Sequence, residues 1–161
     1  NELLGTWQSD KEKTLTWNKE NLKLTPEFED FIENNLGHLF FTFPEDKLCP
    51  AMEEYEAVRK GKTEKYEAWE ESTTYKVTAK TEYGFIIEQV PNPDYEQLLG
   101  HAPPIYTLVI FESKDSMYFE PLTPHKFGHD AYREYMKPAA PNKTINACAP
   151  TAPDAAPLRP L

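Results

Sequence analysis

The sequence has no long apolar run and no excess of basic residues, and each of these absences excludes a class of protein. No stretch approaches the roughly 20 apolar residues that a transmembrane helix needs, so no membrane span is expected. The 17 basic residues are outnumbered by 27 acidic ones, which gives a formal net charge of −10. Such a charge repels a phosphate backbone, so no nucleic-acid partner is expected.

The sequence also lacks the short motifs by which common enzyme classes are recognised. It contains no Gly-x-Ser-x-Gly nucleophile elbow, no glycine-rich phosphate loop after a strand and no cysteine in a known nucleophile motif. We therefore expect a protein that is not an enzyme and that carries no cofactor.

Only two cysteines are present, Cys49 and Cys148. A bridge between them would close a loop of about 100 residues and, in the chain-entropy model, would stabilise the fold by roughly 3–5 kcal/mol. A disulfide would imply export to an oxidising compartment, periplasmic or extracellular. The alternative is two unpaired thiols in a cytosolic protein.

The length of 161 residues is sufficient for one domain with its own apolar core. The periodic part of the sequence ends near residue 137, and residues 138–161 form a Pro/Ala-rich tail without periodicity. Such a tail cannot build a core of its own. We expect a domain over residues 1–137, with the tail tied down by the Cys49–Cys148 bridge if that bridge forms.

What the sequence does contain is a bend and a large aromatic side chain at its start. Gly5 permits a sharp bend in a first strand, and the indole of Trp7 can plug one end of a small β-barrel. Further along the chain, Thr25 is a helix N-cap with Pro26 in the first turn, and Gly37 ends the helix. One apolar stripe is expected on this helix, formed by Phe28, Phe31, Ile32 and Leu36.

The remaining elements are mostly short strands with period-two patterns. Extended segments are predicted at residues 3–9, 13–17, 38–43, 73–79, 85–90, 105–111 and 117–121, with a short closing helix at about residues 129–136. Within 73–79, Tyr75, Val77 and Ala79 are expected to face inward. Residues 48–71 are interpreted as a hairpin broken at Gly61, with a short helix as the alternative.

Three blocks carry a family resemblance: residues 4–15, the Thr25-Pro26-Glu27 helix start that leads into the strand after Gly37, and residues 133–136. Over residues 3–137 the chain resembles uncharacterised bacterial lipocalin-like proteins of the calycin superfamily. The resemblance implies a mainly β fold, a small antiparallel barrel that holds an apolar or amphipathic molecule, with no catalytic residues. It also implies that an arginine near the last strand, Arg133, covers Trp7.

A barrel of this size either holds one small ligand or is filled by its own side chains. If it binds a ligand, we expect the cavity to lie opposite Trp7 and to measure at least about 300 Å³. The expected lining residues are Phe41, Tyr75, Ile87, Val109 and Tyr118. If the barrel is filled, the protein would be a structural or interaction protein that acts through its acidic surface or its tail.

A third hypothesis is a small metal site. His125 and His129 are four residues apart, with Asp130 adjacent, and imidazole and carboxylate groups are suitable Zn²⁺ ligands. Pro124 and Gly128 favour a loop over a helix here, so ordinary surface histidines are the preferred interpretation and no metal is expected.

Overall fold

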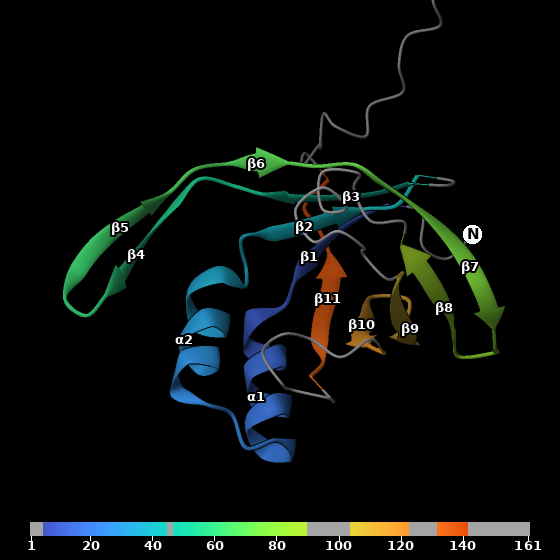
Figure 1. Ribbon diagram of the computed structural model, residues 1–161, viewed down its shortest axis with the longest axis horizontal. Helices are drawn as coiled ribbons and strands as arrows, with labels where there is room; N and C mark the ends of the chain where they lie inside the picture. The colour runs from blue at the N-terminus through green and yellow to red at the C-terminus, as the bar shows by residue number, and fades with distance from the viewer. Residues whose placement is uncertain (1–4, 45–46, 90–103, 123–131, 142–161) are drawn as a thin grey trace, which may run out of the picture.

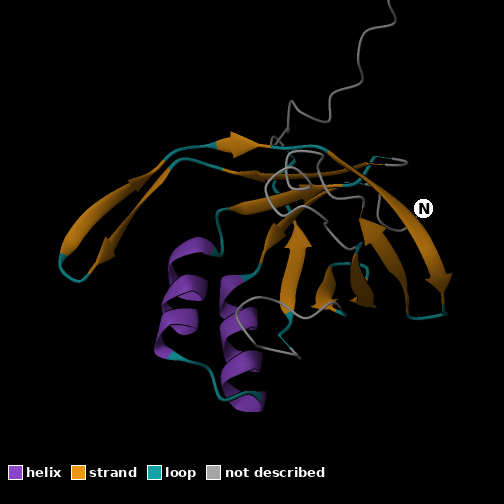
Figure 2. Cartoon of the chain, in the orientation of Figure 1, coloured by secondary structure: helices purple, strands orange, loops and turns teal. Residues whose placement is uncertain are grey.

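The computed structural model describes residues 5–44, 47–89, 104–122 and 132–141 (Figures 1 and 2). Its helices are α1 (Lys11–Asn21) and α2 (Pro26–Asn35). Its strands are β1 (Thr6–Ser9), β2 (Leu39–Thr42), β3 (Lys47–Met52), β4 (Tyr55–Arg59), β5 (Lys62–Tyr66), β6 (Trp69–Glu70), β7 (Thr73–Lys80), β8 (Gly84–Gln89), β9 (Ile105–Ser113), β10 (Ser116–Pro121) and β11 (Glu134–Pro138).

Eight of these strands form a closed antiparallel barrel. They are hydrogen-bonded in the order β2-β1-β11-β10-β9-β8-β7-β3, and pairing of β2 with β3 closes the ring. From β2 to β11 the barrel strands follow one another in chain order, while both helices are inserted between β1 and β2. The predicted fold class, a mainly β protein with a small antiparallel lipocalin-like barrel, is therefore confirmed.

The barrel interior holds the main apolar core. Side chains alternate along each strand, so every second residue points inward. The buried members of this core are Trp7, Phe43, Leu48, Tyr75, Phe85, Ile87, Val109, Met117, Phe119 and Met136. Gly5 precedes β1 with a φ of +136°, a conformation that L side chains rarely adopt, which agrees with the predicted bend.

Helix α1 corrects the prediction that residues 13–17 are extended. Asp10 caps the helix by accepting a hydrogen bond from the Lys13 amide at 3.2 Å. The helix then docks on β11 through polar groups that are fully buried. Asn18 Nδ2 donates to the carbonyl oxygen of Arg133 at 2.7 Å, and the Tyr135 amide donates to Thr14 Oγ1 at 2.9 Å. Because this helix packs through polar side chains, its sequence has no apolar stripe with the helical period of 3.6 residues. The helix was therefore not predicted.

Helix α2 begins and ends as predicted, with Thr25 accepting from the Phe28 amide at 3.3 Å. Phe28, Ile32 and Leu36 are buried in one cluster with Leu39 and Tyr132. Phe31, however, is 37 % exposed, so the expected apolar stripe is only partly shielded at this residue. It lies at the edge of the stripe, stacked on Phe28 with ring centroids 6.1 Å apart.

The predicted hairpin at residues 48–71 is confirmed, and its outer part leaves the barrel as a two-stranded arm, β4–β5 (Figure 1). The arm turns at Lys60 and Gly61, both with positive φ, as a tight two-residue hairpin turn requires. It contacts α2 through an ion pair between Arg59 and Asp30 at 3.0 Å.

Two further expectations about strands are corrected. In β7 only Tyr75 is buried. Val77 is 51 % exposed although it pairs with the buried Ile87 of β8, and Ala79 is exposed after an irregularity that shifts the register with β8. At the end of the domain, the predicted helix is instead β11, which pairs with both β1 and β10. The barrel requires this strand, because without it β1 and β10 would leave open edges.

Candidate functional site

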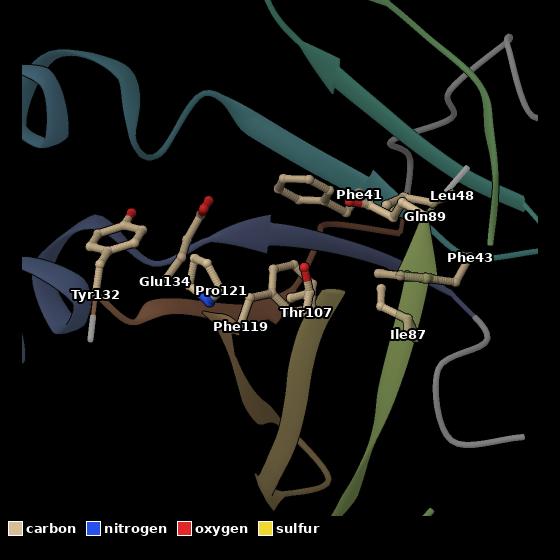
Figure 3. A pocket seen from close by; sticks show the side chains of 10 residues that line it. All are labelled: Phe41, Phe43, Leu48, Ile87, Gln89, Thr107, Phe119, Pro121, Tyr132 and Glu134. Atoms are coloured by element: carbon tan, nitrogen blue, oxygen red, sulfur yellow. The ribbon is translucent and has the colours of Figure 1, made fainter. Parts of the chain in front are cut away.

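The barrel encloses a cavity of about 150 Å³ at the end opposite Trp7 (Figure 3). It lies where β8 and β10 end and β9 and β11 begin. Its walls are mostly apolar, with a few polar groups. The lining residues are Phe41, Phe43, Leu48, Ile87, Gln89, Thr107, Phe119, Pro121, Tyr132 and Glu134.

The position of the cavity agrees with the prediction, but its size does not. The expected volume was at least about 300 Å³, and the observed volume is about half of that. The interior beyond this cavity is filled by packed side chains such as Phe85 and Met117, and by Trp7 against Phe111, whose ring centroids are 6.2 Å apart. An apolar cavity of about 150 Å³ is large enough to hold a benzene molecule.

Glu134 is the chemically unusual residue of this cavity. It lies on β11 opposite Phe119 of β10, on the inward face of the barrel. The residue as a whole is partly exposed, but its Oε1 is closed off from solvent and has no hydrogen-bond partner among the described residues. Burial raises the pKa of this carboxyl from 4.5 to about 7, because the charged form loses its hydration.

Tyr132 lies next to Glu134 at one side of the cavity (Figure 3). Its pKa is raised well above 10, first by burial and then by the Glu134 carboxylate. Its ring packs edge-on against Phe28 of α2, with centroids 5.1 Å apart. The phenol therefore stays neutral at physiological pH and links the cavity to the helical layer.

No cationic side chain lines the cavity among the described residues. Arg133, the neighbour of Glu134 in sequence, points the other way because adjacent residues of a strand face opposite sides. Its guanidinium lies between the rings of Trp17 and Tyr118, 4.2 and 4.3 Å from their centroids, and pairs with Glu120 at 3.0 Å. In the described part of the chain, the carboxyl of Glu134 thus has no countercharge on the cavity wall.

The structure brings together only part of the predicted lining set. Phe41 and Ile87 line the cavity, whereas Tyr75 and Val109 belong to the packed core. Tyr118 faces the outside of the barrel, where it packs against Tyr135 with ring centroids 5.3 Å apart.

The expected pairing of Trp7 with Arg133 at the barrel plug is not observed. Trp7 is buried in the core as predicted, but Arg133 does not cover it. Trp7 points into the barrel, while Arg133 lies outside it on Trp17, so this part of the expectation is wrong. The indole that the arginine covers belongs to α1, a helix that the sequence did not reveal.

The polar lining residues Glu134, Gln89, Thr107 and Tyr132 were not predicted from the sequence. A signal for Glu134 was present, because Glu134 and Met136 alternate with Arg133 and Tyr135 in period two. That pattern was interpreted as part of a helix. As a strand, it places a carboxyl on the same face as a core methionine.

The remaining predicted residues lie outside the described part of the chain. These are His125 and His129 of the metal hypothesis and Cys148 of the disulfide. Among the described residues no group of three or more His, Cys, Asp or Glu is placed to hold a metal ion. In the same ranges, no helix has both the length and the apolar character needed to cross a bilayer.

Comparison with known proteins adds no relative. No family model matches the chain, and neither a curated protein nor a solved structure shows significant similarity to it. The barrel and its cavity therefore have to be interpreted from their own geometry.

Proposed function

We propose that this protein binds a small apolar or amphipathic molecule inside its β-barrel, without catalysing a reaction on it. The observation that carries the proposal is the cavity opposite Trp7, where apolar walls surround a few polar groups. Small-molecule sites have this composition, since apolar surface supplies affinity and a few polar groups fix orientation. A closed β-barrel of this size is compatible with the same role.

The size of the cavity restricts the ligand. Because about 150 Å³ is available, the part of the ligand inside the barrel is about the size of a single six-membered ring. A long acyl chain or a fused ring system would require displacement of core residues such as Phe43 or Ile87. Tightly packed cores resist such displacement.

The alternative is a structural or interaction protein whose barrel is filled. The packed core of the barrel, which includes Phe85 and Met117, favours this alternative. The two functions differ in one measurable property, which is saturable uptake of a ring-sized probe.

We expect fluorobenzene to bind saturably and Thr107→Phe to abolish this binding. Thr107 lines the cavity from β9, and a phenyl ring at this position would fill the space. The measurement is a ¹⁹F NMR titration of fluorobenzene with each protein. Val109 is a less suitable position for such a substitution, because it is fully buried in the core and a larger side chain there would disturb the packing.

Thr63→Phe is the matched control, because it makes the same change at an exposed position of β5 on the arm. It should leave the titration unchanged. If fluorobenzene does not bind to the unmodified protein, the binding proposal fails and the interaction-protein hypothesis replaces it.

We also propose that the protein is exported and that Cys49 pairs with Cys148. Cys49 is fully buried on β3, and Ala139, just after β11, packs against the same small cluster. Cys148 follows Ala139 by nine residues, a stretch that reaches at most about 30 Å. The chain therefore passes close to Cys49 shortly before Cys148.

The expected result is an intact mass, measured without reductant, that is lower by two hydrogens than the mass after reduction. Cys148→Ser should show no such difference, since no bridge can form within one chain. An unmodified protein whose mass does not change on reduction would contradict the pairing, and with it the argument for export.

A further inference from the structure

The inference concerns the chemistry of the ligand, and it rests on the function proposed above. Glu134 is the only carboxyl among the residues that line the cavity, and its Oε1 has no hydrogen-bond partner in the described ranges. An unpaired buried polar group destabilises a fold, so a group that satisfies it would bind favourably. A ligand group that donates a hydrogen bond to Oε1 of Glu134 would satisfy this oxygen.

Within the described ranges, the cavity wall provides no countercharge for this carboxyl. Arg133, the adjacent cation in sequence, is held on the outside of the barrel by Glu120, Trp17 and Tyr118. Besides Glu134, the titratable group that the described residues place on the cavity wall is the neutral phenol of Tyr132. The position beside Glu134 is therefore suited to a cation that arrives with the ligand.

Two further observations favour a cation over a neutral hydrogen-bond donor. Phe41 and Phe119 line the same cavity, with ring centroids 5.4 Å apart in an edge-to-face arrangement. Aromatic rings attract cations as well as other rings. In addition, the net charge of −10 attracts cationic ligands and repels anionic ones such as fatty acids.

We propose that the barrel cavity binds a small primary amine with one apolar or aromatic ring, whose ammonium group is held by the Glu134 carboxylate. The ring occupies the apolar space between the aromatic side chains, and the cavity volume limits it to about the size of benzene. The ammonium donates to Oε1, which satisfies the unpaired oxygen. Charge-assisted hydrogen bonds of this kind are about twice as strong as neutral ones.

The experiment compares two ligands of nearly equal shape, 4-fluorobenzylamine and 4-fluorobenzyl alcohol, by ¹⁹F NMR titration at pH 8. We expect the amine to bind at least about tenfold more tightly than the alcohol, as a charged hydrogen bond would give. Glu134→Gln should remove this preference while the alcohol still binds. Glu112→Gln is the control, because this carboxylate lies on the outer face of β9 and pairs with Lys13.

The outcomes separate this inference from the function on which it rests. If the alcohol binds as tightly as the amine, or more tightly, the amine proposal is overturned while ring binding in the barrel stands. If the preference for the amine survives in Glu134→Gln, the amine proposal is again overturned. If the amine, the alcohol and fluorobenzene all fail to bind, the proposed function itself fails.

A second measurement on the unmodified protein does not depend on how the variant folds. The carboxylate must be ionised to hold the ammonium, and the pKa of Glu134 is about 7. Tyr132, the other titratable group among the described lining residues, stays neutral throughout this range. The affinity for the amine should therefore rise between pH 5 and pH 8, while that for the alcohol should not. A pH-independent affinity for the amine would overturn the proposal.

Discussion

Replacing Glu134 by Gln is expected to stabilise the ligand-free protein by about 3 kcal/mol at pH 8 and by almost nothing at pH 4. In the folded state the pKa of this carboxyl is about 7, and its ordinary value is 4.5. Below pH 4.5 the carboxyl is mostly protonated in both the folded and the unfolded state, so its ionisation has almost no effect on the free energy of unfolding.

Above that pH, ionisation of the carboxyl lowers the free energy of the unfolded chain. In the folded protein the carboxyl stays protonated until the pH reaches its raised pKa. The stability contribution of Glu134 therefore falls as the pH rises from about 4.5 to about 7 and is constant above it. Gln keeps the shape and cannot ionise, so the difference between the two proteins isolates this one group. Urea unfolding at pH 4, 6 and 8 measures it.

Glu112→Gln serves as the control for this series, because its carboxylate is exposed and pairs with Lys13 on the surface. Such pairs contribute at most about 1 kcal/mol, so the control should change little at any pH. A Glu134→Gln protein that is less stable than the original at pH 8 would contradict the description of an unpaired buried carboxyl. So would a stability difference that does not vary with pH.

A stabilising substitution at a cavity residue would also bear on function. Residues that weaken a fold are retained where binding requires them, and removing them then increases stability at the expense of activity. Stability and amine binding should therefore change in opposite directions at Glu134, whereas a purely structural carboxyl would change stability alone.

The parts of the fold that were predictable are those in which local signals and burial agree. Thr25, Pro26 and Gly37 mark the ends of α2, and Phe28, Ile32 and Leu36 are its buried face. The hairpin around Gly61 was also identified, because the turn residue and the period of two point to the same structure.

The parts that were not predictable depend on contacts between distant segments. Helix α1 is held by Thr14 and Asn18, whose partners lie more than a hundred residues away on β11. A buried polar face does not differ in sequence from an exposed one. For the same reason Glu134 looked like one of many surface carboxylates, until β11 placed it on the inward side of the barrel.

The cavity had the same dependence on long-range packing. Its location opposite Trp7 followed from the choice of the plug, whereas its volume depended on how fully Phe43, Phe85 and Met117 occupy the interior. How fully these side chains occupy the interior depends on strand register and on the irregularity in β7. Neither can be derived from a pattern of alternating residues.

Trp7→Ala is expected to reduce the free energy of unfolding by about 3–5 kcal/mol. The indole is only 5 % exposed and packs edge-on against Phe111, whose ring in turn packs against Phe85 at 5.8 Å. Its removal would leave a void at the filled end of the barrel, where rigid strands on all sides restrict relaxation. The destabilisation therefore has two additive contributions, the lost burial of the indole and the void that remains.

The measurement is urea unfolding followed by circular dichroism, because fluorescence would change with the loss of an indole. Trp69→Ala is the matched control, since that indole lies on the short strand β6 and is 37 % exposed. It should destabilise the protein clearly less than Trp7→Ala, because more of this indole is exposed and its removal leaves no void inside the barrel. If Trp7→Ala costs no more than this control, Trp7 does not plug the barrel, because a side chain that fills the closed end cannot be removed without a large loss of stability.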